Sequence, residues 1–213
     1  DAGMSQIARI AGAVATTLVV ATLVADAAWA QNRPSFNGVG DLAGGTYDSI
    51  ADDVSNDGVV VVGGSESGSG PQAFRWTAAG GLVGLGDLSG GAFQSHATGV
   101  SANGSVIVGS GVNSSDESRA FRWTSGSGLV ALNPFFCLLC PNYGFGLSLS
   151  SNGLVAVGGS NDSDDTIEAA RWTGGGTAIS GLGHLSGGGD LSEARGASST
   201  GSVIVGASDA TAG

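Results

Sequence analysis

Two cysteines in the middle of the chain are the first residues whose spacing suggests chemistry. Cys137 and Cys140 form a Cys-x-x-Cys pair inside an apolar stretch. A four-cysteine zinc site needs a second pair, and a thioredoxin-like redox site needs a βαβ context, and the sequence offers neither. In an exported chain the pair most simply closes a small-loop disulfide, so we predict a disulfide between Cys137 and Cys140.

An acidic segment over residues 161–168 is the best metal candidate. Its oxygen ligands alternate along the chain, as Ca²⁺ sites prefer, and the candidate ligands are Asp162, Asp164, Asp165 and Glu168. The glycine that an EF-hand loop carries at its sixth position is absent. We therefore expect a solvated acidic loop and no cofactor, with Ca²⁺ binding as the weaker alternative.

Other catalytic constellations fail on their spacing. His96 and His184 fall at different positions of the repeat described below, and neither has ligand residues beside it in the sequence. No serine lies in a Gly-x-Ser-x-Gly turn with plausible partners, and the Gly-x-Gly segments lack the helix that a phosphate loop requires. We expect no catalytic residue.

An arginine recurs beside a tryptophan once in each of three segments. The pairs are Arg75-Trp76, Arg122-Trp123 and Arg171-Trp172. A ring of such arginines could read a ligand, but a scaffold ion pair with a carboxylate or carbonyl of a neighbouring strand is the favoured interpretation. Asp41 and Asp87 recur at the joints between segments and are the predicted partners.

These residues belong to a repeat. A Ser-x-(Asn/Asp/Thr)-Gly tetrad followed by an apolar run and a second glycine recurs four times, and the glycine pairs are Gly58 and Gly63, Gly104 and Gly109, Gly153 and Gly158, and Gly201 and Gly206. The tetrad predicts a tight hairpin turn, because Asn or Asp bonds its own backbone and Gly adopts positive φ. The Val-Ile-Val run predicts a strand buried on both faces.

The repeat predicts an all-β fold with four strands per unit. In the second copy the expected strands are Ala97–Ser101, Val106–Ser110, Arg119–Thr124 and Leu129–Leu132. A four-stranded unit of about 47 residues is the size of a β-propeller blade, with a β-solenoid as the alternative. The units are approximately 38–83, 84–130, 131–179 and an incomplete 180–213. A lone strand at Gly38–Leu42 is expected to complete a last blade of a longer protein.

Composition and the N-terminus define the compartment. Residues 4–30 read as a signal peptide, with Arg9 before an apolar run and Ala28-Trp29-Ala30 as an A-x-A site cleaved after Ala30. The net charge of −11 disfavours nucleic acid and anionic lipid as partners. We expect membrane association only through a C-terminal anchor outside this sequence, and a location that is secreted, periplasmic or at the outer-membrane surface.

The joint into the third copy departs from the pattern. Residues 131–144 replace the Gly-Leu-Gly-Asp-Leu of the other joints with a longer apolar segment that includes Phe135, Phe136 and both cysteines. Two interpretations stay open: a surface loop that contacts a partner, or an insertion that packs on its own blade.

The motifs resemble a known family. Gln72–Thr77, Gly81–Gly91 and Ala97–Gly109 are similar to the HAF family of extracellular repeats, which is named for a His-Ala-Phe triplet. The triplet is degenerate here, since its first position is Gln72, Arg119 or Glu168. The resemblance covers residues 38–213. It implies an exported bacterial protein, and some members carry an autotransporter barrel, but it assigns no catalytic residue.

Together these features predict a non-enzymatic surface scaffold. We expect a binding or adhesion module for an extracellular protein or glycan, in one form the passenger of an autotransporter. The alternative is an exported propeller enzyme that acts on extracellular glycans. The residues that recur have scaffold explanations, so specificity is expected where copies differ, chiefly in residues 133–146 and 160–168.

Overall fold

The computed structural model describes residues 37–135, 143–161, 166–187, 189 and 191–210. All the elements below belong to the compact unit Val39–Gly213. The predicted signal peptide and its cleavage site, the Cys137–Cys140 disulfide, and the calcium candidates Asp162, Asp164 and Asp165 lie outside the described residues. A search of the described residues for a helix long and apolar enough to span a membrane finds none.

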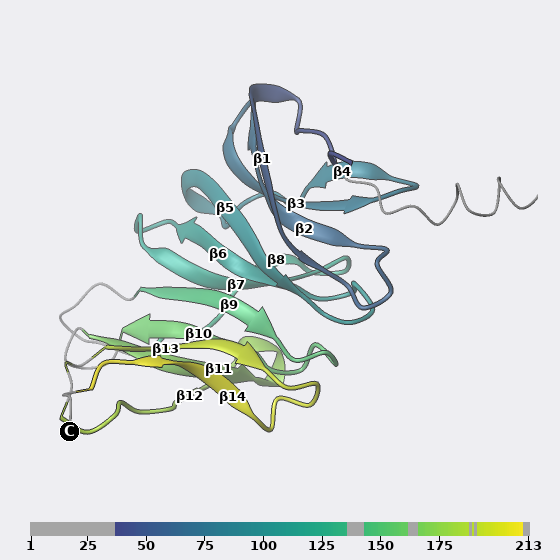
Figure 1. The fold of residues 1–213 in the computed structure, drawn as a ribbon. Coiled ribbons are helices and arrows are strands. Elements are labelled where there is room, and N and C mark those ends of the chain that lie inside the picture. The colour runs from purple at the N-terminus through teal and green to yellow at the C-terminus, as the bar shows by residue number, and fades with distance from the viewer. Residues whose placement is uncertain (1–36, 136–142, 162–165, 188, 190, 211–213) are drawn as a thin grey trace, which may run out of the picture. The chain divides into compact units, whose positions relative to one another are not determined.

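The described chain forms antiparallel sheets in sequence order (Figure 1). The first sheet consists of β1 (Gly44–Val54), β2 (Val61–Ser67), β3 (Gly70–Thr77) and β4 (Gly81–Gly84). The second consists of β5 (Gly90–Val100), β6 (Ile107–Asn113), β7 (Ser118–Thr124) and β8 (Gly128–Ala131). The third consists of β9 (Gly144–Leu149), β10 (Ala156–Asn161), β11 (Ile167–Thr173) and β12 (Ala178–Gly181), with the 3₁₀ turn η1 (Gly174–Gly176) before β12. The fourth pairs β13 (Ser192–Ala197) with β14 (Ile204–Ser208).

The first two strands of every sheet are joined by the predicted turn. Gly58 has a φ of 70°, and its amide donates to the carbonyl of Ser55 over 2.8 Å. The buried Ser55 hydroxyl accepts from the amide of Val60 and donates to the carboxylate of Asp57. The second and third copies repeat these bonds with Ser101 and Asn103, and with Ser150 and Asn152. The turn requires glycine because this position has a left-handed backbone conformation. It requires serine because the hydroxyl makes the hydrogen bonds that close the turn.

The second glycine of each repeat has a different requirement. A Cβ on Gly63, Gly109 or Gly158 would lie 1.9 Å from a carbonyl oxygen of the neighbouring first strand. The register of the first two strands shifts at this point in each sheet, as in a β-bulge. The recurring glycine therefore permits the close backbone approach at the bulge.

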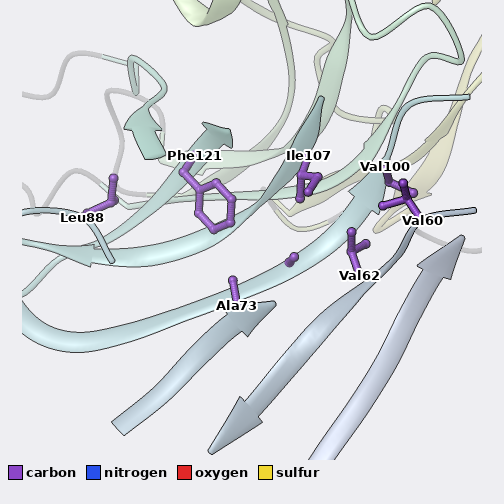
Figure 2. Packing of buried hydrophobic residues seen from close by; sticks show 8 residues of the cluster. Val60, Val62, Ala73, Leu88, Val100, Ile107 and Phe121 are labelled. Carbon is purple, nitrogen blue, oxygen red and sulfur yellow. The ribbon is translucent and has the colours of Figure 1, made fainter. Parts of the chain in front are cut away.

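Successive sheets pack face to face through apolar residues. Val60, Val62 and Ala73 of the first sheet meet Ile107 and Phe121 of the second in one buried cluster (Figure 2). A second cluster joins Val106, Val108 and Ala120 to Leu149 and Trp172 of the third sheet, and a third joins Val155, Val157 and Ala169 to Ala194. The aromatic residue of the third strand fills the space toward the preceding sheet, as Phe121 and Trp172 show.

The contacts between sheets define the fold class. The first strands contact one another in succession, β1 with β5, β5 with β9 and β9 with β13, whereas the fourth strands make no comparable contacts. Backbone hydrogen bonds also join successive turns, from Asn56 to Ala102 and from Ala102 to Ser151. Antiparallel four-stranded blades joined at their first strands form a β-propeller-like repeat fold and not a β-solenoid.

One predicted strand is wrong. Gly38–Leu42 precedes β1 as irregular chain, and so do the equivalent joints after β4 and β12. The reason is local: Gly40, Gly86 and Gly183 have φ values of 91°, 87° and 78°, and a left-handed residue ends the strand geometry. The first strand instead follows the joint, so that β5 begins at Gly90, before the predicted Ala97.

Candidate functional site

The candidate site is a groove between the first two sheets, which we call the His96 groove. It has a volume of about 110 Å³ and is lined by Asp48, Ile50, Gly64, Ser65, Glu66, Pro71, Gln72, Ser95 and His96. These residues come from β1, β2 and β3 on one side and from β5 on the other. The groove therefore exists only when two units pack together.

His96 is bonded at one ring nitrogen and packed against backbone at the other. Its Nε2 lies 2.8 Å from Oδ2 of Asp52, which belongs to the preceding unit, and both side chains are about one-third exposed, 39% and 32%. The Nδ1 edge packs against Gly64, where an added Cβ would lie 2.2 Å from Nδ1. The imidazole is thus held between β1 and β2.

The serines of the groove are also engaged in the scaffold. The buried Ser95 hydroxyl donates to the carbonyl of Gly86 over 2.6 Å and accepts from the amide of Ala73 over 3.0 Å. The Ser65 hydroxyl donates to Asp41 and accepts from the amide of Leu42. A Ser-His-Asp arrangement needs a serine bonded to the histidine, so these contacts oppose nucleophilic catalysis by Ser65 or Ser95.

Two carboxylates of the groove keep their charge uncompensated. Among the described residues, no ion pair involves Asp48 or Glu66, and neither carboxylate accepts a hydrogen bond. No basic side chain other than His96 lines the groove. The described residues contain no cluster of three His, Cys, Asp or Glu side chains that could hold a metal ion. The groove is therefore suited to a cationic group.

The predicted arginine ion pairs are wrong. In the part of the chain that the structure describes, no carboxylate pairs with Arg75, Arg122 or Arg171. Asp41 bonds Ser65, and Asp87 accepts from the amide of Gln94 over 3.1 Å.

Strand register explains this outcome. Arg75 lies opposite Val62 on β2 and Val83 on β4, and Arg122 lies opposite Val108 and Val130, so both are in the middle of a sheet. The aspartates lie at the joints. Arg122 instead lines a small cavity beside Trp172 and Leu149 of the next unit. Arg122 thus contributes to the packing between sheets.

Of the four calcium candidates, the structure describes Glu168. Its Oε1 accepts a hydrogen bond from the amide of Gly183 over 2.8 Å, and its carboxylate covers Gly181. The same repeat position holds Gln72 over Gly84 in the first unit and Arg119 in the second. Arg119 pairs with Glu117 over 2.6 Å, and burial lowers the pKa of its guanidinium.

In the first unit the first position of the degenerate triplet, Gln72, lines the His96 groove. The sequence contains a signal for other residues of the groove. Aligning the copies on their glycines places Asp48 with Gln94, Tyr143 and Leu191, and Glu66 with Val112, Asn161 and Asp209. The positions of Asp48 and Glu66, which differ in every copy, line the groove together with the scaffold serines Ser65 and Ser95. Residues 133–146 and 160–168 are only part of this variable set.

Comparison with known proteins supports the fold. The structure is similar to that of TolB from Acinetobacter baumannii, with a TM-score of 0.55 and 11% sequence identity over 78% of this chain and 39% of that one. It is similar to a putative TolB from Agrobacterium tumefaciens, with a TM-score of 0.54 and 16% identity over 79% of this chain and 57% of that one.

These neighbours contain β-propellers, and their likeness shows an all-β, propeller-like fold. The chain spans less than two thirds of the length of either protein. No protein-family model matches the sequence. No curated protein matches it either.

Proposed function

We propose that this chain is an exported, non-enzymatic binding scaffold of the HAF type, whose His96 groove holds a basic side chain of an extracellular protein. One observation carries the proposal: Asp48 and Glu66 line one small groove, and neither has a cationic partner in the described part of the chain. An arginine or lysine would supply the missing charge and hydrogen-bond donors.

The size of the groove favours a side chain over a sugar chain. Small-molecule sites usually have volumes of about 300–1,000 Å³, and this groove has about 110 Å³. Its apolar wall, from Ile50 and Pro71, suits the methylene stem of a long basic residue. The net charge of −11 adds a long-range attraction for a basic partner.

The test is an NMR titration of the ¹⁵N-labelled protein with N-acetyl-arginine amide. We expect the backbone shifts to cluster at Gly64, Gln72, Ser95 and His96, which line the groove. Asp48→Asn should weaken the binding at least about threefold, because it removes one of the two carboxylates. Asp57→Asn is the matched control, since it removes the same charge from a turn outside the groove. Chemical-shift changes and a binding strength that stay the same in the Asp48→Asn variant would refute the proposal.

A glycan-active enzyme is the second candidate, because Asp48 and Glu66 form a carboxylate pair in one groove. This candidate requires that the chain release a chromophore from an aryl glycoside and that both Asp48→Asn and Glu66→Gln abolish the release. The anchoring of His96 and the small volume of the groove support the binding function instead.

Export is supported by the A-x-A pattern that ends at Ala30 and fits the propeller-like fold shared with TolB proteins. Expression in a bacterial host followed by mass spectrometry of the periplasmic fraction tests it. We expect a mature N-terminus at Gln31, and retention of residues 4–30 in the cytosol would contradict it.

A further inference from the structure

The second sheet contains a groove of nearly the same size as the His96 groove. Its volume is about 100 Å³, and its lining includes Gln94, Ser110, Val112 and Ser118 from β5, β6 and β7. We call it the Gln94 groove. The second sheet contacts the first sheet through β5 and the third sheet through β9, so this groove belongs to a unit with a neighbour on each side.

Strand register shows that the two grooves are equivalent. His96 lies opposite Ser110 and Val112 lies opposite Ser118, just as Ile50 lies opposite Gly64 and Glu66 lies opposite Pro71 in the first sheet. Gln94 accordingly has the position of Asp48. The repeat therefore builds the same hollow twice and lines it with different side chains.

The two grooves are also contiguous. Ser95 and His96 line both of them, so that β5 forms a wall of each. One ligand can therefore reach from one groove into the other. In an extended peptide, side chains two residues apart point to the same side and lie about 7 Å apart, so a short extended segment can present two side chains to adjacent grooves.

The lining of the Gln94 groove selects a neutral, hydrogen-bonding group. Gln94 and Val112 replace the two carboxylates of the His96 groove, and no Asp, Glu, Lys or Arg among the described residues lines it. Gln94 is exposed, and neither its carboxamide nor the Ser110 hydroxyl makes a hydrogen bond within the described residues. Both groups can donate and accept, and a carboxamide ligand offers the same pair of functions. A charged ligand would lose hydration without a counter-ion.

We infer that the Gln94 groove is a second subsite, which holds the carboxamide of an asparagine or glutamine two residues away from the basic residue in the His96 groove. The partner is then an extended segment of an extracellular protein that carries a basic residue, any residue and an amide residue, in one of the two chain directions. This inference rests on the proposed function for the first position, while the lining of the Gln94 groove supports the second position separately.

The test is an NMR titration of the ¹⁵N-labelled full chain with acetyl-Arg-Gly-Gln-amide and with the reversed acetyl-Gln-Gly-Arg-amide. We expect one of the two peptides to shift the backbone amides of Ser110, Gly111 and Val112 in addition to those of Gly64 and Gln72. Replacing its glutamine by alanine should weaken binding at least about threefold, because the hydrogen bonds to the carboxamide are lost.

A variant that exchanges the chemistry of the two grooves completes the test. Gln94→Asp gives the second groove the residue of the first, Asp48. We expect this variant to bind acetyl-Arg-Gly-Arg-amide at least about threefold more tightly than either glutamine peptide. Ser125→Asp is the matched control, because it adds the same charge at an exposed residue that lines neither groove, and it should keep the preference for glutamine.

The outcomes separate the two claims. Shifts at Gly64 and Gln72 with equal affinity for the glutamine and alanine peptides would overturn the second subsite and leave the proposed function intact. Shifts at Ser110, Gly111 and Val112 without shifts at Gly64 and Gln72 would support the carboxamide subsite and refute the proposed function. Binding of neither peptide would overturn both.

Discussion

At the residue scale, the second glycine of each repeat lets two strands approach closely because it has no side chain. A Cβ on Gly109 would lie 1.9 Å from the carbonyl oxygen of His96 and 2.8 Å from Phe121. We expect Gly109→Ala to lower the free energy of unfolding by about 3 kcal/mol, since both β5 and Phe121 must shift. Gly126→Ala is the control, because nothing lies within 4 Å of its Cβ position. Urea denaturation of both variants checks this, and equal midpoints would contradict it.

The second unit lacks a hydrogen bond of the first unit because it has a glycine, Gly111, in place of a serine. Asp41 accepts from the Ser65 hydroxyl, but the equivalent of Ser65 in the second unit is Gly111, and Oδ1 of Asp87 is buried without a partner. A Cβ on Gly111 would lie 3.4 Å from that oxygen and 3.3 Å from Leu88.

We therefore expect Gly111→Ser to raise the free energy of unfolding by about 1 kcal/mol, because its hydroxyl satisfies the buried carboxylate oxygen. Gly111→Ala adds the same Cβ without the donor and should be neutral or destabilising. Thermal unfolding of both variants distinguishes the two effects. A serine variant no more stable than the alanine variant would show that Asp87 is satisfied in another way.

The first turn contains the residue with a clear pH signature. Hydrogen bonds from the Ser55 hydroxyl and the Val59 amide hold the pKa of the Asp57 carboxyl below its ordinary value. A lowered pKa in the folded state means that the stabilisation is present above the ordinary Asp value of about 4 and is lost as pH falls through the folded value.

Asp57→Asn keeps the acceptor oxygen and removes the titration, and asparagine already occupies this position at Asn103 and Asn152. We expect the variant to lose less stability than the parent between about pH 5 and pH 2. Chemical denaturation across that range measures the difference. Parallel pH curves for the two proteins would contradict the assignment.

At the scale of elements, the strands and turns could be predicted because their signals are local. The motif Ser-x-Asn-Gly, or a variant of it, predicts each turn, and Arg-Trp-Thr predicts each third strand. The structure places hairpins and strands at these residues. The strand predicted at Gly38–Leu42 was wrong because its apolar residues surround Gly40, whose left-handed backbone a composition pattern does not reveal.

The site could not be predicted from the sequence in the same way. His96 meets Asp52 and Gly64 only because two sheets pack, and these residues are separated along the chain by a whole unit or most of one. The arginine partners were wrong for the same reason, since strand register and not recurrence decides what Arg75 faces. Residues that differ between copies were the signal that the sequence offered. They identify the groove only when it is known on which face of its sheet each residue lies.

A buried serine on β5, Ser95, links one unit to the next. Ser95 bonds Gly86 of its own joint and Ala73 of the preceding unit, whereas the equivalent Ser49 bonds only Gly40 within the described residues. We expect Ser95→Ala to cost about 2 kcal/mol, because it leaves the buried Ala73 amide and the partly buried Gly86 carbonyl without this partner. Ser49→Ala should cost less than 1 kcal/mol by the same reasoning. Comparable losses in denaturation experiments would contradict this role of Ser95.

At the scale of the whole molecule, recurring and variable residues have separate tasks. The glycines, turn serines and aromatic residues that recur hold one sheet against the next, and no recurring residue faces the His96 groove with a free charge in the described structure. The residues that differ between copies provide the exposed chemistry. A scaffold of this kind can change its partner without changing its packing.

One exchange between units tests this division most directly. Asp48→Gln combined with Glu66→Val gives the first unit the residues of the second, Gln94 and Val112, at the same positions. The control variant combines Asp57→Asn with Asp116→Asn, which removes the same amount of negative charge from residues that do not line the His96 groove. We expect both double variants to stay within about 1 kcal/mol of the parent in stability, and only the first to lose the shifts that N-acetyl-arginine amide causes at the His96 groove. Loss of the fold in the first variant, or retained arginine binding, would contradict the account.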